Sequence, residues 1–151
     1  MTRSEEASKW FADGYNCSQS VLTSFGREYG LTDEQCLKLG CAFGGGIARR
    51  QLTCGVVTGA LMVIGLHFGR GAGAPYSTTT GTYERANRFI AEFTKRNGSI
   101  NCKELLQGLD MTVPADMAKI QSLGLFQNNC ARYVKDAVEL TEWILAQKTT
   151  V

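Results

Sequence analysis

Residues 54–69 read CGVVTGALMVIGLHFG and form the longest apolar stretch in this chain of 151 residues. The stretch is shorter than the roughly 18–20 apolar residues that a membrane-crossing helix needs, and glycines interrupt it. A helix that is apolar on every side is typical of the centre of a folded protein. We therefore predict a central, buried, glycine-rich helix against which the rest of the chain packs.

The sequence on both sides of this stretch has the period of helices. Apolar residues recur at spacings of three and four, and alternating strand-like segments are absent. Two pairs predict helix starts with a capping box, Thr2 with Glu5 and Thr32 with Gln35. The spacing predicts helices over 2–14, 17–29, 32–43, 54–69, 80–96, 102–109 and 130–147, and a short one opening at Pro114. We expect an all-α fold, a single compact helical domain of about six to eight helices over residues 1–151.

Two of these helices carry more specific expectations. Along residues 80–96 the periodicity places Tyr83 and Phe93 on the inner face and Arg85 on the solvent face. In the apolar stretch, Gly55 and Gly59 lie four residues apart and predict the close approach of a second helix. Tight packing inside the chain and a homodimer seam are the two alternatives for this pair.

Composition and charge exclude several classes of protein. Sixteen Lys and Arg against 14 Asp and Glu give a formal charge of +2, too small to indicate binding to nucleic acid or an anionic membrane. The first residues, MTRSEEASKWFADGY, contain no apolar run and no small-residue cleavage site, which favours a cytoplasmic protein over a secreted one. Because cytoplasmic thiols stay reduced, we expect the six cysteines to act as ligands or redox groups rather than as structural disulfides.

Four of the six cysteines share one local context. Each follows a residue that caps helices well, in the pairs Asn16-Cys17, Thr53-Cys54, Asn101-Cys102 and Asn129-Cys130. We expect the four sulfurs at helix N-termini, where the partial positive charge of the helix lowers the pKa of a thiol. Apolar residues continue from the cysteine's own face of these helices, so the side chains are expected to point inward. Together they predict one thiolate-rich pocket.

The other two cysteines are expected to differ from these four. Cys36 lies inside the helix over 32–43, where a buried cysteine acts as a small apolar side chain. Cys41 lies beside the glycines at 44–46, where the backbone allows a ligand to approach closely. We therefore predict contacts to a bound cofactor from Cys41, Gly45 and Gly55.

The cysteine pattern resembles that of a known family, the putative redox-active proteins named for the motif C…GCAxxG…C…C. Residues 40–45 read GCAFGG and match GCAxxG, and residues 54–59 read CGVVTG, which looks like the related CGAxxG form with Val56 in place of alanine. The resemblance covers about residues 16–145 and implies that the main cysteines are Cys17, Cys54, Cys102 and Cys130. It implies a redox or metal-centre role. A looser similarity to the iron–sulfur part of split-Soret cytochromes favours a cluster, and no CxxCH haem motif is present.

The residues leave three functions open. In the first, a cysteine of low pKa, Cys54, carries out thiol–disulfide exchange and a second cysteine resolves the product. In the second, Cys17, Cys54, Cys102 and Cys130 hold an iron–sulfur cluster or a zinc ion. In the third, the chain is a non-enzymatic helical interaction module with inert buried cysteines. The sequence identifies neither the substrate nor the redox partner, and it does not decide whether the protein is an enzyme.

Overall fold

The helix predicted from the apolar stretch, α4 (Gly55–Phe68), lies at the centre of the fold in the computed structural model, which describes residues 1–147. Within that range the chain folds into eight α-helices and no strand. They are α1 (Arg3–Ala12), α2 (Cys17–Gly26), α3 (Asp33–Gly40), α4, α5 (Tyr76–Asn97), α6 (Cys102–Leu105), α7 (Pro114–Ser122) and α8 (Ala131–Ala146). The all-α prediction and its number of helices are confirmed. None of the described helices combines the length and apolar character needed to cross a bilayer.

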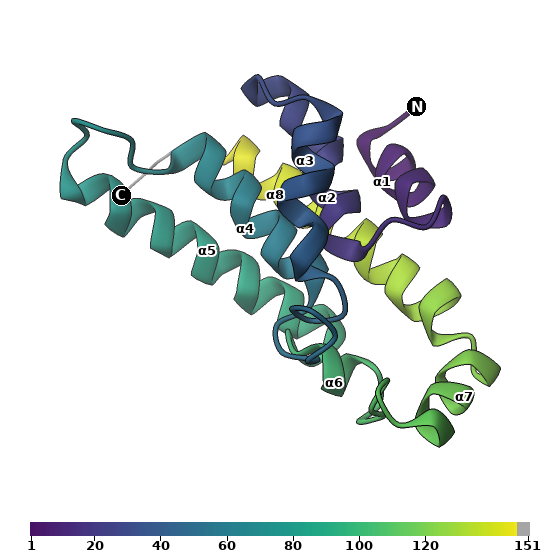
Figure 1. The fold of residues 1–151 in the computed structure, drawn as a ribbon. Helices are drawn as coiled ribbons and strands as arrows, with labels where there is room; N and C mark the ends of the chain where they lie inside the picture. Colours follow the sequence, from purple (N-terminus) through teal and green to yellow (C-terminus); the bar gives the residue numbers. More distant parts are fainter. Residues whose placement is uncertain (148–151) are drawn as a thin grey trace.

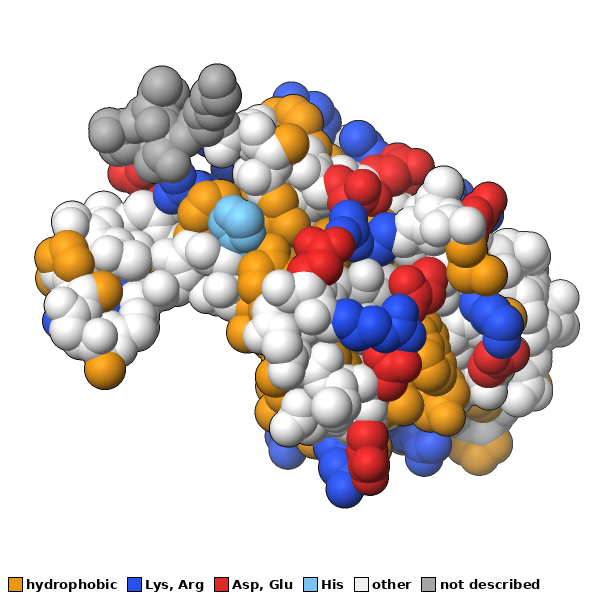
Figure 2. All heavy atoms as spheres, turned by 90° about the horizontal axis from the view of Figure 1, so that it is seen from above, with side chains coloured by type: hydrophobic (Ala, Val, Ile, Leu, Met, Phe, Trp, Pro, Cys, Tyr) orange, Lys and Arg blue, Asp and Glu red, His pale blue; other side chains and the backbone are white. Residues whose placement is uncertain are grey.

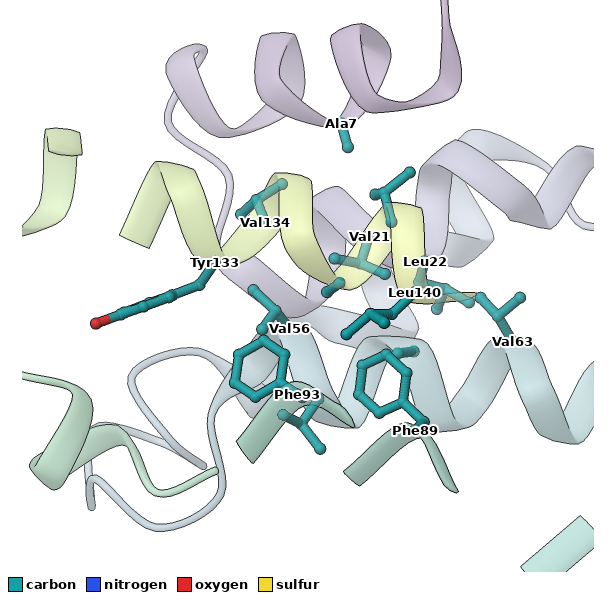
Figure 3. Close-up of a cluster of buried hydrophobic side chains, with 14 of the residues drawn as sticks. Ala7, Val21, Leu22, Val56, Val63, Phe89, Phe93, Tyr133, Val134 and Leu140 are labelled. Atoms are coloured by element: carbon teal, nitrogen blue, oxygen red, sulfur yellow. The ribbon is translucent and has the colours of Figure 1, made fainter. Parts of the chain in front are cut away.

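The hydrophobic core forms where α4 packs against α2, α5 and α8 (Figure 1). The helix α1 covers α2 and α8 from the other side. Buried side chains from all five helices meet between them, among them Ala7, Val21, Val56, Phe89 and Val134 (Figure 3). Burying a large apolar side chain contributes about 1.5–3 kcal/mol, so this core is the main source of stability.

Two glycines explain how closely α2 approaches α4. A β-carbon at Gly55 would lie 3.0 Å from the β-carbon of Cys17, and one at Gly59 would lie 2.9 Å from the carbonyl oxygen of Ser18. The face of α4 that the sequence assigns to a second helix is therefore occupied by α2 of the same chain. This seam does not serve as a homodimer interface, and a homodimer through another surface stays a prediction.

Two helices begin at the predicted capping boxes. The hydroxyl of Thr2 accepts the N–H of Glu5 at 3.1 Å, and the hydroxyl of Thr32 accepts the N–H of Gln35 at 3.1 Å. In both cases the second side chain reaches back to the backbone of the first residue. These ends depend only on residues close in sequence, which is why the sequence predicts them well.

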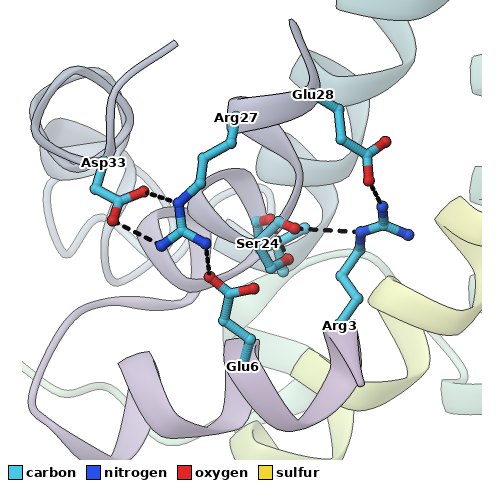
Figure 4. Close-up of polar contacts among 7 residues, drawn as sticks. Arg3, Glu6, Ser24, Arg27, Glu28 and Asp33 are labelled. Carbon is cyan, nitrogen blue, oxygen red and sulfur yellow. Dashed lines mark hydrogen bonds and ion pairs between the residues drawn. The ribbon is translucent and has the colours of Figure 1, made fainter. Parts of the chain in front are cut away.

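Ion pairs tie α1 to the segment that follows α2. Arg3 pairs with Glu28, and Arg27 pairs with Glu6 at 2.9 Å and with Asp33 at 2.7 Å (Figure 4). Each pair has at least one largely exposed partner, so each contributes at most about 1 kcal/mol. Their effect is to orient α1 rather than to hold the core together.

The helix α5 differs from its prediction in its start and in its buried face. It begins before residue 80, and its buried side chains are Arg85, Phe89 and Phe93. Tyr83, predicted to face inward, is 62% exposed. The guanidinium of Arg85 lies 4.0 Å from the centre of the Phe68 ring, and this stacking covers a side chain that the sequence places in solvent. The predicted positions of Tyr83 and Arg85 are both wrong. Arg85 packs on Phe68, and the helix buries the neighbouring face, which carries Arg85, Phe89 and Phe93.

The only histidine of the chain lies at the surface, at the opposite end of α4 from Cys54. Figure 2 shows it beside hydrophobic side chains on a face that carries charges of both signs. Nδ1 of His67 and the hydroxyl of Tyr29 share a hydrogen bond of 2.8 Å. His67 is therefore not a candidate ligand at a site built on Cys54.

Candidate functional site: a cavity lined by cysteines

A cavity of about 780 Å³ opens between the main bundle and a smaller layer formed by α6, α7 and the turn before α8. Five of the six cysteines line it: Cys17, Cys41, Cys54, Cys102 and Cys130. The core of the main bundle contains Cys54 and packs against Cys17, whereas the smaller core contains Cys102. Cys130 packs against both. The four cysteines that share the cap context therefore reach the cavity from both of its walls.

These four cysteines lie near enough to influence one another's charge. The thiols of Cys17 and Cys130 form a hydrogen bond, and a charge on one thiol raises the pKa of another in all six pairings of the four. Cys36 lies outside the group, buried in α3 against Gly26 and near the charges of Asp33 and Arg27. The sequence indicates one site for the four cysteines, and the structure brings all four to one cavity.

The first turn of α2 holds Cys17, as predicted. Oδ1 of Asn16 accepts the N–H of Gln19 at 2.9 Å, and the Gln19 side chain accepts the N–H of Asn16 at 2.8 Å. The Asn16 amide also donates to the carbonyl oxygens of Gly40 and Cys41, at 3.2 and 3.0 Å. This cap fixes the end of α2 that bears Cys17 to the end of α3, so that Cys41 lies exposed at the rim of the same cavity.

An isolated antiparallel bridge brings Cys54 and Cys102 to one face. The bridge pairs Thr53 with Asn101, and the N–H of each cysteine donates to a carbonyl oxygen of the facing segment at 2.7 Å. Side chains alternate along paired segments, so both cysteines point away from the side that carries Thr53 and Asn101. They are diagonal neighbours, and α-carbons in this relation are about 7–8 Å apart.

Cys130 does not lie at a helix N-terminus, and the cap predicted at Asn129 is wrong. A π-helical turn, Leu125–Cys130, runs directly into α8, so the helix has no end at Asn129 for a side chain to cap. Turns of this kind occur frequently at functional sites, where they change the direction of a side chain. Cys54 departs less from its prediction. It is the N-cap of α4 rather than the first helical residue, so the helix begins one residue later than predicted.

Burial outweighs the helix dipole at Cys54 and Cys102. Burial raises the pKa of Cys54 to about 12, although the nearby backbone N–H groups of Val56 and Val57 act in the opposite direction. Burial, together with the charge of Cys130, raises the pKa of Cys102 to about 12. The prediction of lowered pKa values is wrong for both, because the thiolate loses more solvation in the cavity wall than the helix end restores.

The hydrogen bond between Cys17 and Cys130 shifts their pKa values in opposite directions. The sulfur of Cys130 accepts the Cys17 thiol, which stabilises the Cys130 thiolate and lowers its pKa against the effect of burial. The same hydrogen bond, with burial, raises the pKa of Cys17 well above its usual value. The prediction of a lowered pKa is therefore wrong for Cys17 and holds for Cys130, though for a different reason. A thiolate beside a protonated thiol suits thiol–disulfide exchange.

The raised pKa values predict that the protein loses stability at alkaline pH. An unperturbed thiol of the unfolded chain has a pKa of 9.0, whereas folded Cys54 keeps its proton to about 12. Between these values the unfolded state holds fewer protons, so the free energy of unfolding falls by about 1.4 kcal/mol per pH unit for each such thiol. We expect Cys54→Ala to remove the part of this pH dependence of the free energy of unfolding that comes from Cys54. Urea unfolding between about pH 8 and about pH 11 measures both slopes, and equal slopes would contradict the raised pKa.

The backbone between α3 and α4 winds into a left-handed coil beside the cavity, visible in Figure 1 as a loop that circles next to α6. From Gly45 to Arg49, five successive residues have φ angles between 50° and 67°. A residue with a side chain costs about 1–2 kcal/mol in this conformation. Hydrogen bonds of 3.0 Å from Arg49 to Gly44 and from Gln51 to Gly45 close the coil.

This coil forms one wall of the cavity, through residues 44–46, Ala48 and Arg49. It lies so close to α6 that a β-carbon at Gly46 would be 2.7 Å from the β-carbon of Cys102. The buried Gln51 side chain bonds the backbone of the segment over 109–111 twice, at 2.7 Å each. The coil therefore holds the small layer in place and presents Arg49 at the cavity.

The three residues predicted to contact a cofactor, Cys41, Gly45 and Gly55, all line the cavity. The apolar part of the wall was not predicted: Phe11, Leu105, Leu106, Met111, Met117, Phe126 and Tyr133. Such side chains at helical spacing indicate an ordinary core. They meet at a cavity only because the smaller layer with α7 packs against the main bundle. No sequence signal marks them.

The donor geometry discriminates between kinds of metal centre. Within residues 1–147, no group of three or more His, Cys, Asp or Glu side chains is arranged to hold a metal ion. A zinc ion holds sulfurs about 2.3 Å away, which places them roughly 3.8 Å from one another. Zinc therefore does not fit the four cysteines as they stand.

The chain matches the family described as "Putative redox-active protein (C_GCAxxG_C_C)" over residues 15–144. The chain belongs to this family. All six cysteines fall within the matched range, and the resemblance seen in the motifs is confirmed. Membership gives the class of activity, redox chemistry, without its mechanism. No curated protein and no solved structure matches the chain.

Proposed function

We propose that this protein carries out thiol–disulfide exchange and that Cys17 and Cys130 are the exchanging pair. The two thiols line the same cavity and interact closely enough to shift each other's pKa in opposite directions, and this coupling carries the proposal. The redox class of the family supports the same chemistry.

The unequal pKa values assign the order of the steps. The Cys130 thiolate attacks one sulfur of a substrate disulfide, the S–S bond breaks, and the first substrate thiolate leaves. The sulfur of Cys17 then attacks the Cys130 sulfur of this mixed disulfide, and the Cys17 proton passes to the second leaving thiolate. One substrate disulfide and two protein thiols give two substrate thiols and a Cys17–Cys130 disulfide.

Cys54 and Cys102 are expected to stay reduced during this reaction. As diagonal neighbours their α-carbons are about 7–8 Å apart, at or beyond the roughly 7 Å limit for an unstrained disulfide. With pKa values raised to about 12, neither thiol is ionised to any useful extent at pH 7. Cys130 therefore takes the role of nucleophile that the sequence assigns to Cys54.

The number of substrate thiols released in a single turnover tests this pair. Reduced protein carrying Cys41→Ser, which removes the exposed thiol, is mixed with one equivalent of a small disulfide. We expect two equivalents of substrate thiol. Adding Cys17→Ser should stop release at one equivalent, and adding Cys130→Ser should slow it by about tenfold or more, because the remaining thiols are protonated.

The matched control is Cys36→Ser in the same background, because Cys36 is free but lies outside the cavity. It should still release two equivalents of substrate thiol. Release of two equivalents by the Cys17→Ser protein would mean that another cysteine resolves the mixed disulfide, and the assignment of the pair would fail.

A second candidate is an electron-transfer protein in which Cys17, Cys54, Cys102 and Cys130 ligate an iron–sulfur cluster. The mutual electrostatic influence of these four thiols around one cavity favours it. A cluster would supply one-electron transfer there, and the four thiols would bind as thiolates. Iron and acid-labile sulfide analysis of anaerobically prepared protein discriminates the two. Both elements in the protein, lost in Cys102→Ser, would favour the cluster over the exchange pair.

A further inference from the structure

We infer that the substrate is a small, flat, largely apolar disulfide that carries a negative charge. This inference rests on the exchange function proposed above, because it names the substrate of the same cysteine pair. It follows from three features of the cavity: the access that it gives, the side chains that line it and the single charge at its rim.

Access to the pair limits the size of the substrate. Cys17 and Cys130 are only partly exposed, and both form part of the wall of the cavity of about 780 Å³. Cavities of roughly 300–1,000 Å³ are the size that encloses single small ligands. A disulfide on the surface of a folded protein would have to insert a loop into this space, so a free small molecule is the better fit.

The side chains of the wall select an apolar and aromatic body. Beside the cysteines it contains aliphatic, aromatic and thioether groups, and the side chains at the smaller layer include Met111, Met117 and Phe126. All three are only partly buried. Thioether sulfur and aromatic edges form favourable contacts with flat rings. A substrate ring held against these side chains stays beside Cys130, which packs against the same layer.

One charged residue lines this largely apolar cavity. Arg49 is the only charged residue that lines the cavity, and it takes part in none of the ion pairs found within residues 1–147. The left-handed coil fixes its backbone, and its side chain lies across Gly45, where a β-carbon would be 2.9 Å from Cγ of Arg49. A guanidinium held this way at the rim matches a carboxylate or sulfonate of the substrate.

Two aromatic disulfides that differ in charge test the inference. The reagent 5,5′-dithiobis(2-nitrobenzoate) carries two carboxylates, whereas 4,4′-dithiodipyridine is neutral. In the Cys41→Ser background, Arg49→Gln should slow the reaction with the nitrobenzoate reagent by about tenfold, and Arg49→Lys should restore most of the rate. The rate with the neutral reagent should change less than about twofold, and added salt should slow only the charged reagent.

The outcomes separate this inference from the exchange function. If Arg49→Gln slows both reagents equally, or neither, while each still yields two equivalents of thiol, the charged substrate is wrong and the exchange pair stands. If neither reagent yields two equivalents with the unsubstituted Arg49, the exchange function itself fails. Rapid reduction of insulin, a protein disulfide, would overturn the restriction to small substrates.

Discussion

Gly59→Leu is expected to lower the free energy of unfolding by about 3 kcal/mol or more, a large share of the roughly 5–15 kcal/mol that stabilises a domain. A β-carbon at this position would lie 2.9 Å from the carbonyl oxygen of Ser18 and 3.1 Å from the β-carbon of Val21. Neither neighbour moves easily, since one is helix backbone and the other is a branched side chain with no exposed surface. The larger side chain would therefore separate α2 from α4 and open the centre of the core.

Gly65 gives the matched control, because it lies in the same helix with nothing within 4 Å of a built β-carbon. Thermal and urea unfolding of Gly59→Ala and Gly65→Ala compare the two sites with the smallest change. The first should destabilise, whereas the second should gain up to about 1 kcal/mol from the better helix propensity of alanine. Equal melting of the two variants, or a Gly59→Leu protein as stable as the unsubstituted one, would contradict the packing described for α2 and α4.

The sequence predicts those parts of this fold that depend on neighbours along the chain. The capping boxes at Thr2 and Thr32, and the cap at Asn16, involve residues three positions apart, and all three form. The buried helix is equally local, since 14 residues of apolar character are enough to place α4 at the centre. Four cysteines in a shared context then indicate a site, although not its shape.

The remaining features depend on segments that are far apart in sequence. The coil from Gly45 to Arg49 is held against α6 by Gln51 and by the absence of a side chain at Gly46, which no local pattern reveals. The π-turn before α8 replaces a predicted helix start, and it decides that Cys130 contacts Cys17.

The pKa values show why helix-end reasoning is incomplete at this site. A helix N-terminus stabilises a thiolate only where solvent or a partner replaces the hydration that burial removes. At Cys54 no such replacement offsets burial, and the pKa rises to about 12. At Cys130 a neighbouring thiol supplies the replacement. Burial is a property of the assembled fold, so the sequence groups the four cysteines but names Cys54, rather than Cys130, as the nucleophile.

Mild oxidation is expected to join Cys17 to Cys130 and to leave Cys36, Cys54 and Cys102 as free thiols. The two sulfurs already share a hydrogen bond, and the thiolate that attacks is the one whose pKa is lowered. The competing pair, Cys54 and Cys102, flanks the bridge at Thr53 as diagonal neighbours, a relation with typical α-carbon separations of about 7–8 Å that disfavours a disulfide. We expect this cross-link to dominate, because Cys17 and Cys130 interact through a hydrogen bond, whereas Cys54 and Cys102 influence each other only through charge.

Peptide mapping by mass spectrometry of the oxidised protein measures this directly. The protein is treated with a small disulfide, denatured, alkylated without reduction and digested. The account predicts one cross-link, Cys17 to Cys130, with Cys36, Cys54 and Cys102 alkylated, and no such cross-link after full reduction. A Cys54–Cys102 cross-link in its place, or six alkylated cysteines after the same treatment, would contradict the central claim that Cys17 and Cys130 form the redox-active pair.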